Sequence, residues 1–505
     1  GKVYDRYEEA ALFALAQGFN DRAFRYVESM KARTFLDQLT EGRIELEKGI
    51  DPDLKRKGDD IENALATVTN RISEEYRKTS PDEKALMYLR TEVERFSLEL
   101  DRLKKQIRMK NPLYATIKYP DPVTVADLQT KVLSSDEVLL EFFVTSQGVY
   151  CFAVTTDSFG AVKLSGGKKD FYAKIESLLG NLESGAARGE GYDRASAGDL
   201  YDILLKPFEK IMAGKTLLVV PDGILTRLPF EALVIAKNGE RSYLLEQHAV
   251  KYVQSASVLT MLRKQSSPAQ TSNSFIGFGD PVYDYNSFKQ GKPERDGTLS
   301  DRGISAGGDR SRYAGVGGRL GRLKASGDEV LGIERLFKAQ KQDGQILLRD
   351  KASEESAKAA GMDQYGYVHF SMHGIVAPGL QAIVFSQIPG ASEDGILTMG
   401  EIMNLRYNAR LVVLSACQTG LGEEERGEGI TGLTRAVMYA GSPAAVVSLW
   451  SVDDSGTHEL MTRFYENMIQ KKAGKSEALR RAKQEMIKTR YRHPFFWAAF
   501  VMYGE

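Results

Sequence analysis

The feature that most constrains this chain is a series of short apolar runs, each followed by a stretch with helical periodicity, from about residue 168 onward. Runs that are apolar at every position are typical of strands buried on both faces, as in a parallel sheet covered by helices. The sequence therefore predicts an α/β fold built on a mostly parallel sheet. The predicted strands lie at 216–220, 275–278, 345–348, 367–370, 382–385, 410–414, 444–449 and 499–502.

Two segments depart from this alternation. Residues 138–164 contain three short β-rich runs joined by polar turns, which is typical of an antiparallel meander. Residues 285–327 are rich in Gly, Ser, Arg and Asp and contain few apolar side chains. Because such a composition buries little apolar surface, we expect 285–327 to be a mobile insertion.

The part of the chain before residue 118 is predicted to be helical. Apolar residues recur at heptad spacing in two stretches of 51–118, which predicts a long antiparallel hairpin with one buried seam on each helix. Ser80, Pro81 and Glu83 have the pattern of a helix start between them. Pairing with another chain is the alternative, and the turn between the halves favours self-pairing.

Residues 1–50 are predicted to form two helices. Small residues and a turn glycine at 18 give them the pattern of the end of a tetratricopeptide repeat, and an ordinary amphipathic hairpin is the alternative. The first residue is Gly rather than Met, so we expect the numbering to start inside a longer natural chain.

Composition limits the compartment and the partners. Lys+Arg and Asp+Glu both number 68, so charge gives no argument for binding nucleic acid or an anionic membrane. Two cysteines cannot form a disulfide framework, and the sequence has neither a secretory signal pattern nor an apolar run of membrane-spanning length. We expect a soluble cytoplasmic protein that contacts nucleic acid only indirectly, if at all.

Two predicted strands end in residues that can carry chemistry. One runs into His373 and Gly374, and another runs into Cys417. Because the carboxyl ends of parallel strands meet at one edge of the sheet, His373 and Cys417 can come together there. An adjacent imidazole activates a thiol as a nucleophile and later protonates the leaving amine. The backbone N–H groups of Gly374 and Cys417 are then candidate donors to the oxyanion.

Other candidate residues have weaker support. His369 lies four residues before His373, so these histidines with Cys417 form a possible metal set, but no second cysteine or carboxylate cluster completes a zinc shell. We therefore expect His369 to pack on the sheet, and we expect neither a metal nor another cofactor. Cys151 lies in the predicted meander and is expected to be inert.

The region from about 120 to 505 resembles the CHAT domain, a caspase-like module associated with tetratricopeptide repeats and related to separase and the caspases. The resemblance lies in motifs that follow one another in order: VVPDGILTRLPFEAL (219–233), VHFSMHG (368–374), DGILTMGE (394–401), LSACQTG (414–420), RGEGITGL (426–433), SLWSVDD (448–454) and HPFFWAAF (493–500). It implies a caspase-like sheet with a pseudo-caspase first half at 119–275 and a catalytic half at 276–505. The catalytic His and Cys of the family fall on His373 and Cys417.

The resemblance also implies a function. A protein of this kind is expected to be a cysteine endopeptidase that cuts one or a few protein targets, is switched on by a protein activator that contacts the helical half, and acts in bacterial defence or programmed cell death. Asp453 and Asp454 are candidates for the pocket that binds the residue before the scissile bond, and capping of the following helix is the alternative. Two rival functions stay open: a catalytically silent scaffold, and a hydrolase or acyltransferase acting on a small ester or thioester.

Overall fold

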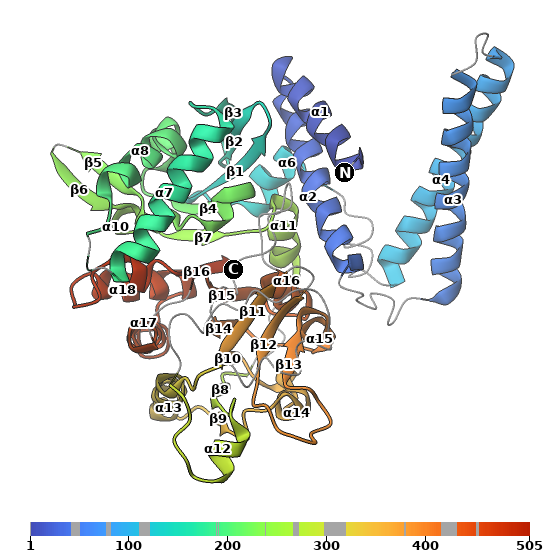
Figure 1. The fold of residues 1–505 in the computed structure, drawn as a ribbon. Helices are drawn as coiled ribbons and strands as arrows, with labels where there is room; N and C mark the ends of the chain where they lie inside the picture. The colour runs from blue at the N-terminus through green and yellow to red at the C-terminus, as the bar shows by residue number, and fades with distance from the viewer. Residues whose placement is uncertain are drawn as a thin grey trace. The chain divides into compact units, whose positions relative to one another are not determined.

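The computed structural model describes residues 2–41, 51–76, 82–110, 122–187, 189, 191–237, 239–265, 272–296, 320–377, 380–415, 432–450 and 454–505. The chain divides into two compact units. One combines Gly1–Thr34 with Val123–Glu505, and the other is Phe35–Pro122. The first unit contains the sheet and the candidate site (Figure 1).

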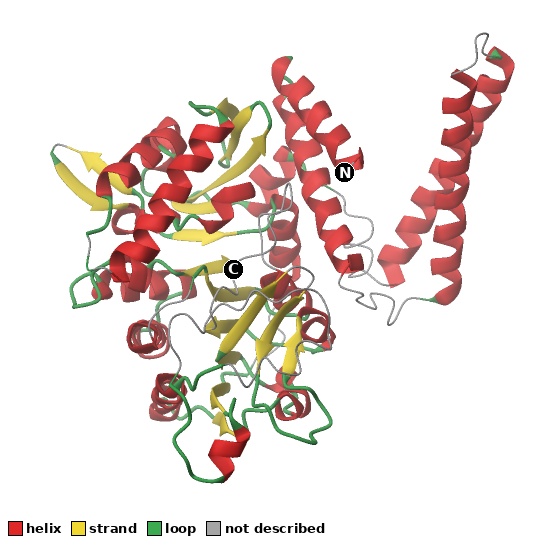
Figure 2. Cartoon of the chain, in the orientation of Figure 1, coloured by secondary structure: helices red, strands yellow, loops and turns green. Residues whose placement is uncertain are grey.

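An eleven-stranded sheet forms the centre of the first unit (Figure 2). From one edge to the other its strands are β3 (Phe159–Lys163), β2 (Gly148–Val154), β1 (Glu137–Thr145), β4 (Thr216–Val220), β7 (Val250–Tyr252), β16 (Phe500–Gly504), β15 (Ala444–Ser448), β14 (Leu411–Ser415), β10 (Tyr367–Ser371), β8 (Phe275–Pro281) and β9 (Gly344–Arg349). Within the described residues, only β3·β2, β2·β1 and β16·β15 pair antiparallel, and the other neighbouring strands are parallel. The predicted mostly parallel sheet is confirmed.

Helices surround the sheet and are preceded by the helical segment that the sequence predicts. In chain order the helices of this unit are α1 (Lys2–Ala16), α2 (Asn20–Glu41, whose last residues belong to the second unit), α6 (Val125–Asp127), α7 (Lys168–Ala187), α8 (Arg194–Leu204), α9 (Glu209–Met212), α10 (Leu244–Gln247), α11 (Ala256–Gln265), α12 (Tyr285–Lys289), α13 (Lys324–Ala339), α14 (Glu354–Ala359), α15 (Met399–Asn404), α16 (Gly432–Tyr439), α17 (Asp454–Tyr465), α18 (Lys475–Met486) and α19 (Pro494–Trp497). Every residue of β10, β14 and β15 is buried, as expected for strands covered on both faces. None of the helices in the described ranges has an apolar stretch long enough to cross a membrane.

Three strands that follow β10 lie outside the main sheet. β11 (His373–Ala377), β12 (Leu380–Val384) and β13 (Ile396–Thr398) form a separate antiparallel sheet, and β5 (Val234–Lys237) pairs with β6 (Glu240–Tyr243) in a two-stranded ribbon. The prediction that 382–385 belongs to the parallel sheet is therefore wrong. The connection between β11 and β12 is too short for the crossover that parallel strands require, so the two strands pair antiparallel.

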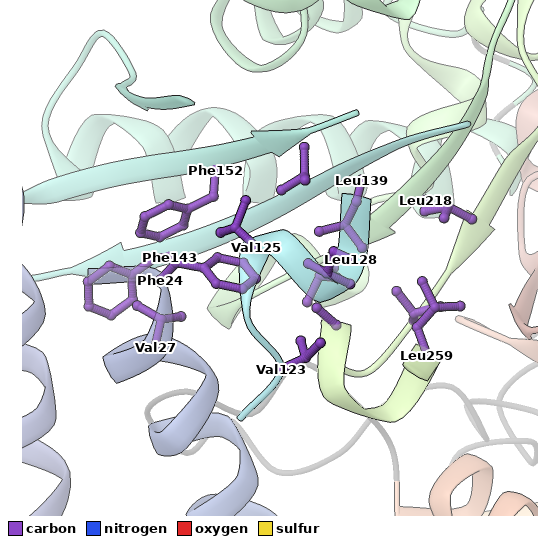
Figure 3. Close-up of a cluster of buried hydrophobic side chains, with 14 of the residues drawn as sticks. Phe24, Val27, Val123, Val125, Leu128, Leu139, Phe143, Phe152, Leu218 and Leu259 are labelled. Atoms are coloured by element: carbon purple, nitrogen blue, oxygen red, sulfur yellow. The ribbon is translucent and has the colours of Figure 1, made fainter. Parts of the chain in front are cut away.

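The N-terminal helices α1 and α2 share a core with the sheet. Phe24 of α2 packs edge-to-face against Phe152 of β2, with ring centroids 5.6 Å apart. Phe24 and Val27 belong to a buried apolar cluster with residues of α6, β1, β2, β4 and α11 (Figure 3). Residues 1–34 are thus part of the α/β unit, whereas the sequence favoured a helical segment spanning 1–50.

Buried charges on α2 strengthen this attachment. The Glu28 carboxylate accepts hydrogen bonds from the backbone N–H groups of Ala256 (3.0 Å) and Ser257 (2.7 Å), so it caps the start of α11. One helical turn further along, Lys31 forms an ion pair with Glu141 of β1, at 3.0 Å between Nζ and Oε1. Burial, followed by the charge of Glu28, raises the pKa of Glu141 well above its usual value.

The segment 285–327, predicted to be a mobile insertion, is described only at its two ends. Its first part contains α12, and its last part enters α13, where Ser326 and Gly327 are buried. A bridge between Asp296 and Arg322 joins the two described ends. Residues 297–319 lie outside the described residues.

The second unit contains two long helices, α3 (Pro52–Tyr76) and α4 (Glu83–Lys110), that pack against each other. Ile61 and Leu103 lie at the centre of the apolar seam between them, both at positions that the heptad pattern predicts. The start of α4 is capped by Asp82, whose carboxylate accepts from the N–H of Lys84 at 2.9 Å. The predicted cap, Ser80, lies outside the described residues.

Replacement of Lys31 tests the attachment of α2. Lys31→Ala leaves the fully buried Glu141 carboxylate without its cation, which should lower the free energy of unfolding by about 3–5 kcal/mol at a pH above the raised pKa of Glu141. Because a protonated Glu141 needs no cation, the deficit should shrink as the pH falls. Urea unfolding at several pH values measures both effects. Arg25→Ala, an exposed position on the same helix, is the control and should change the stability by less than about 0.5 kcal/mol. Equal stability of Lys31→Ala and the control would contradict this account.

Candidate functional site

His373 lies just beyond the end of a central strand. β10 ends at Ser371, and after Met372 the chain enters β11 with His373 as its first residue. His373 and Gly374, into which the predicted strand runs, are thus the start of a strand in the separate sheet of β11–β13. The neighbour of β10 in the main sheet, β14, runs parallel to it, and Ser371 of β10 lies opposite Ser415 of β14. Cys417 follows Ser415 by two residues, as His373 follows Ser371, and it lies outside the described residues.

The imidazole of His373 is fully buried and held by contacts from two segments. Its Nε2 lies 2.8 Å from the carbonyl oxygen of Gly321, so this nitrogen carries a proton and donates it to the carbonyl. The ring of Tyr283 lies against the imidazole with centroids 4.9 Å apart. The hydroxyl of Tyr283 accepts from the backbone N–H of His373 and donates to the carbonyl of Val384, both at 3.2 Å. These contacts fix the position and the neutral tautomer of His373.

The other predicted residues of the site are placed only in part. Gly374 is the second residue of β11 and lies opposite Ile383 of β12. Asp454 is the first residue of α17 and is partly buried there, in the first turn of a helix, where a negative charge is favourable. Asp453 lies outside the described residues.

His369 belongs to a different buried network. Its Nε2 lies 2.7 Å from Oε1 of Glu329 on α13, and its Nδ1 lies 3.3 Å from the hydroxyl of Tyr465 on α17. Burial, followed by the charge of Glu329, raises the pKa of Tyr465 well above its usual value, so the phenol keeps its proton. Both ring nitrogens of His369 thus have protein partners on the helices that cover this face, which fits the predicted packing role and not a metal ligand.

Cys151 occupies the middle of β2 and is fully buried. Burial, followed by the charge of Glu141, raises the pKa of its thiol well above the usual value. Because only the thiolate is a good nucleophile, this environment agrees with the expectation that Cys151 is inert.

A cluster of three carboxylates elsewhere in the unit has the spacing of a metal site. Glu354, Glu393 and Glu401 bring their oxygens within 4.8 Å of one another. The ammonium group of Lys358 already lies among them, at 2.8, 2.7 and 3.0 Å respectively. Lys358 therefore occupies the position between these carboxylates and neutralises part of their negative charge.

Two acids of the 219–233 motif have structural roles. Asp222 accepts from the backbone N–H of Val144 at 2.6 Å and thereby links the end of β4 to β1. Glu231 pairs with Lys483 of α18 at 2.7 Å and accepts from the hydroxyl of Tyr252 at 2.5 Å. These buried carboxylates hold together segments that are far apart in the sequence.

Sequence reasoning missed the residues that hold His373. Asp280 and Tyr283 lie at and just beyond the carboxyl end of β8, the strand on the other side of β10. Asp280 has a φ of 46°, which is unusual for a residue other than glycine, and it binds the guanidinium of Arg322. Their position just after the predicted strand at 275–278, at the same edge of the sheet as His373, is the sequence signal that could have identified Asp280 and Tyr283.

Comparison with known proteins decides the family. Residues 194–505, more than half of the chain, match the CHAT domain. The chain belongs to the CHAT domain family. The resemblance seen in the sequence motifs is thereby confirmed, and His373, Gly321 and Tyr283 all lie within the matched residues.

The curated relatives of this CHAT protein are much longer than the matched stretch. A segment of 109 residues, 22% of the chain, is 28% identical to tetratricopeptide repeat protein 28 of Mus musculus and covers 4% of it. A segment of 355 residues, 60% of the chain, is 21% identical to tetratricopeptide repeat protein 28 of Homo sapiens and covers 13% of it. The chain thus spans a small part of these relatives.

Among the solved structures similar to this chain are a separase–securin complex and a cysteine proteinase, both at low sequence identity. The separase–securin complex of Saccharomyces cerevisiae aligns with 100% of this chain and 40% of its own, at a TM-score of 0.41 and 12% identity. The Arg-specific cysteine proteinase gingipain R aligns with 62% of this chain and 68% of its own, at a TM-score of 0.38 and 9% identity.

Removal of the His369 side chain tests its assignment as a packing residue. His369→Phe removes the donor to the buried Glu329 carboxylate, so the free energy of unfolding should fall by about 2–3 kcal/mol. Tyr465→Phe removes only the longer contact and should cost no more than about 1 kcal/mol. Urea unfolding compares the variants. A melting temperature that rises on addition of zinc in wild type but not in His369→Phe would instead show that His369 is a metal ligand.

Proposed function

We propose that this CHAT protein is a cysteine endopeptidase in which Cys417 is the nucleophile and His373 is its acid–base partner. One observation carries the proposal: β10 and β14 are parallel neighbours with Ser371 opposite Ser415, and each strand is followed two residues later by one member of the pair. Chain segments that leave the same edge of a sheet side by side can bring these two side chains into contact.

The contacts of His373 support a particular division of roles between its ring nitrogens. Because Nε2–H is bound to the carbonyl of Gly321, Nδ1 carries the lone pair in the neutral ring and is the nitrogen that takes the proton from Sγ of Cys417. A third catalytic side chain is not needed for orientation, since the Gly321 carbonyl and Tyr283 already hold the imidazole.

The reaction then follows in two steps. The Cys417 thiolate attacks the scissile carbonyl carbon, and the negative oxygen is stabilised by the N–H groups of Gly374 and Cys417. The tetrahedral intermediate collapses, the C–N bond breaks, and the amine leaves with the proton held by His373. Water, deprotonated by His373, hydrolyses the thioester and restores the thiol.

The substrates and regulation belong to the same proposal. The proposal includes a protein substrate with one or a few cleavage sites, a protein activator that contacts the helical segments, and a role in bacterial defence or programmed cell death, as the sequence resemblance to the CHAT domain implies. On α4, the neighbouring residues Met87 and Tyr88 are 67% and 65% exposed and offer apolar surface for such a contact. A free, buried Cys151 agrees with a reducing, cytoplasmic location.

Two substitutions test the proposed dyad. Cys417→Ala and His373→Ala should each reduce cleavage of a protein substrate by at least about 1,000-fold, because neither residue can work without the other. The readout is the set of cleavage products formed in a host lysate, identified by mass spectrometry. Fractions of the lysate are added separately so that an activating protein can be detected. Cys151→Ala is the matched control and should keep full activity. If Cys417→Ala still cleaves at more than a few per cent of the wild-type rate, the mechanism is wrong. If a covalent probe for cysteine peptidases labels neither cysteine of the wild-type protein, a catalytically silent scaffold is favoured instead.

Specificity is tested at Asp454. A carboxylate lining the pocket would bind an Arg or Lys of the substrate just before the scissile bond. An apolar residue there would leave the carboxylate unpaired, which should raise the activation free energy for kcat/KM by at least about 1 kcal/mol. A positional-scanning peptide library should therefore show a basic preference that Asp454→Ala weakens at least about fivefold. If wild type prefers Leu or Met, or if Asp454→Ala keeps the basic preference, Asp454 only stabilises the start of α17 and the pocket assignment falls.

A further inference from the structure

We propose that the ion pair between Arg322 and Asp280 is the positioning element that holds the Gly321 carbonyl against His373 and so sets the orientation and proton affinity of the imidazole. The catalytic consequence of this inference rests on the proposed peptidase function, whereas the effect on His373 itself does not. Neither Arg322 nor Asp280 contacts the reacting atoms in this account; both act through Gly321.

The peptide of Gly321 is anchored on both sides. Arg322 forms a two-pronged contact with Asp280, from Nε to Oδ1 at 2.8 Å and from Nη2 to Oδ2 at 2.6 Å. Its backbone N–H also donates to the carbonyl of Arg295 at 2.8 Å. On the other side, Leu320 is buried in the apolar cluster that contains Tyr283. A planar fork of this kind restricts rotation as well as distance, so it holds the preceding carbonyl in a fixed direction.

Asp280 is itself held firmly at the end of β8. Its backbone N–H donates to Oγ of Ser326 at 2.8 Å, and Arg349 contacts its carboxylate at 2.7 Å and its carbonyl oxygen at 3.2 Å. Its left-handed conformation costs free energy and persists only where the surroundings enforce it. Since β8 is the direct neighbour of β10, the anchor and the histidine are attached to adjacent strands of one sheet.

The carbonyl determines the chemistry of the imidazole. A hydrogen bond from Nε2–H to a carbonyl is stronger when the ring is protonated, so loss of this acceptor should make the imidazole harder to protonate. Tyr283 is a titratable side chain that lies against the imidazole. The other members of the cluster around it are apolar, namely Leu320, Ile375, Ala382, Val384 and Ile396. Cys417 is the further titratable group that the proposed mechanism adds.

The contact is suited to positioning rather than to global stability. The Arg322 side chain is 30% exposed and that of Asp280 is 9% exposed, but Asp280 keeps Arg349 as a cation when Arg322 is removed, so the loss should cost little stability. A matched arginine exists elsewhere: Arg463 on α17 contacts Glu459 through Nε at 2.9 Å and is 28% exposed. Removal of either guanidinium should therefore affect folding about equally, and only removal of Arg322 should change His373.

The test compares Arg322→Gln and Asp280→Asn with wild type and with Arg463→Gln, all in the full chain. The His373 imidazole is titrated by NMR, and its signal among the five histidines is assigned with His373→Gln. We expect its pKa to fall by about 0.5–1 unit in both variants, because a carbonyl free to move is a poorer acceptor. The basic limb of the kcat/KM profile should move to lower pH by the same amount. We also expect kcat to fall about 10-fold with KM nearly unchanged.

The double variant Arg322→Gln/Asp280→Asn should change the His373 pKa no more than Asp280→Asn alone, since that single variant already removes the contact with Arg322 as well as weakening the one with Arg349. Arg322→Lys keeps the positive charge but loses the two-pronged contact, so its His373 pKa should lie between those of wild type and Arg322→Gln. It replaces Arg322→Gln in the test if that variant fails to fold. An unchanged His373 titration in folded Arg322→Gln or Arg322→Lys, or an equal change in Arg463→Gln, would overturn the inference. If wild type proves inactive while the His373 pKa still falls in Arg322→Gln, the positioning role stands and the proposed peptidase function fails.

Discussion

The parallel pairing of β10 with β14 is the constraint on which the account of this site depends. Because Ser371 and Ser415 lie opposite each other, the residues that follow these strands leave the same edge of the sheet in step. A shift of one residue in this register would turn every side chain of one strand to the other face and separate the two strand-end motifs. On its other side β10 pairs with β8. Three adjacent strands therefore carry the site: β14 leads to the proposed nucleophile Cys417, β10 leads to His373, and β8 carries Asp280, which anchors Arg322 beside the Gly321 carbonyl.

The rest of the unit is held together by buried charges that join distant parts of the chain. Lys483 and Glu231, which are 252 residues apart, form a buried ion pair between α18 and the 219–233 motif. On α2, Lys31 forms a buried ion pair with Glu141 of β1, and the Glu28 carboxylate accepts from backbone N–H groups at the start of α11. Breaking one partner of such a pair is costly because the other stays buried, so these contacts specify how the segments assemble. The buried acids of the CHAT motif at 219–233 are explained by this structural role.

Much of the fold could be predicted from local patterns, and the positioning contacts could not. Continuous apolar runs predicted the parallel sheet, heptad spacing predicted the seam around Ile61 and Leu103, and the strand-end argument predicted His373. The sheet of β11–β13 was missed because its strands resemble those of the parallel sheet, and only the short connection at 378–379 distinguishes them. The Gly321 carbonyl has no sequence signal, since any residue supplies a carbonyl. Lys31 and Glu28 look like exposed helix positions in the sequence.

The central claim, that His373 activates Cys417, is tested most directly by the pH dependence of Cys417 alkylation. In the Cys151→Ala background Cys417 is the sole thiol, so the rate of its reaction with iodoacetamide reports its thiolate content. The account predicts rapid alkylation well below the ordinary thiol pKa of about 8.5, and a return to that ordinary value in His373→Ala. An alkylation profile centred at about 8.5 in both proteins would contradict it, because the thiol would then be independent of the imidazole.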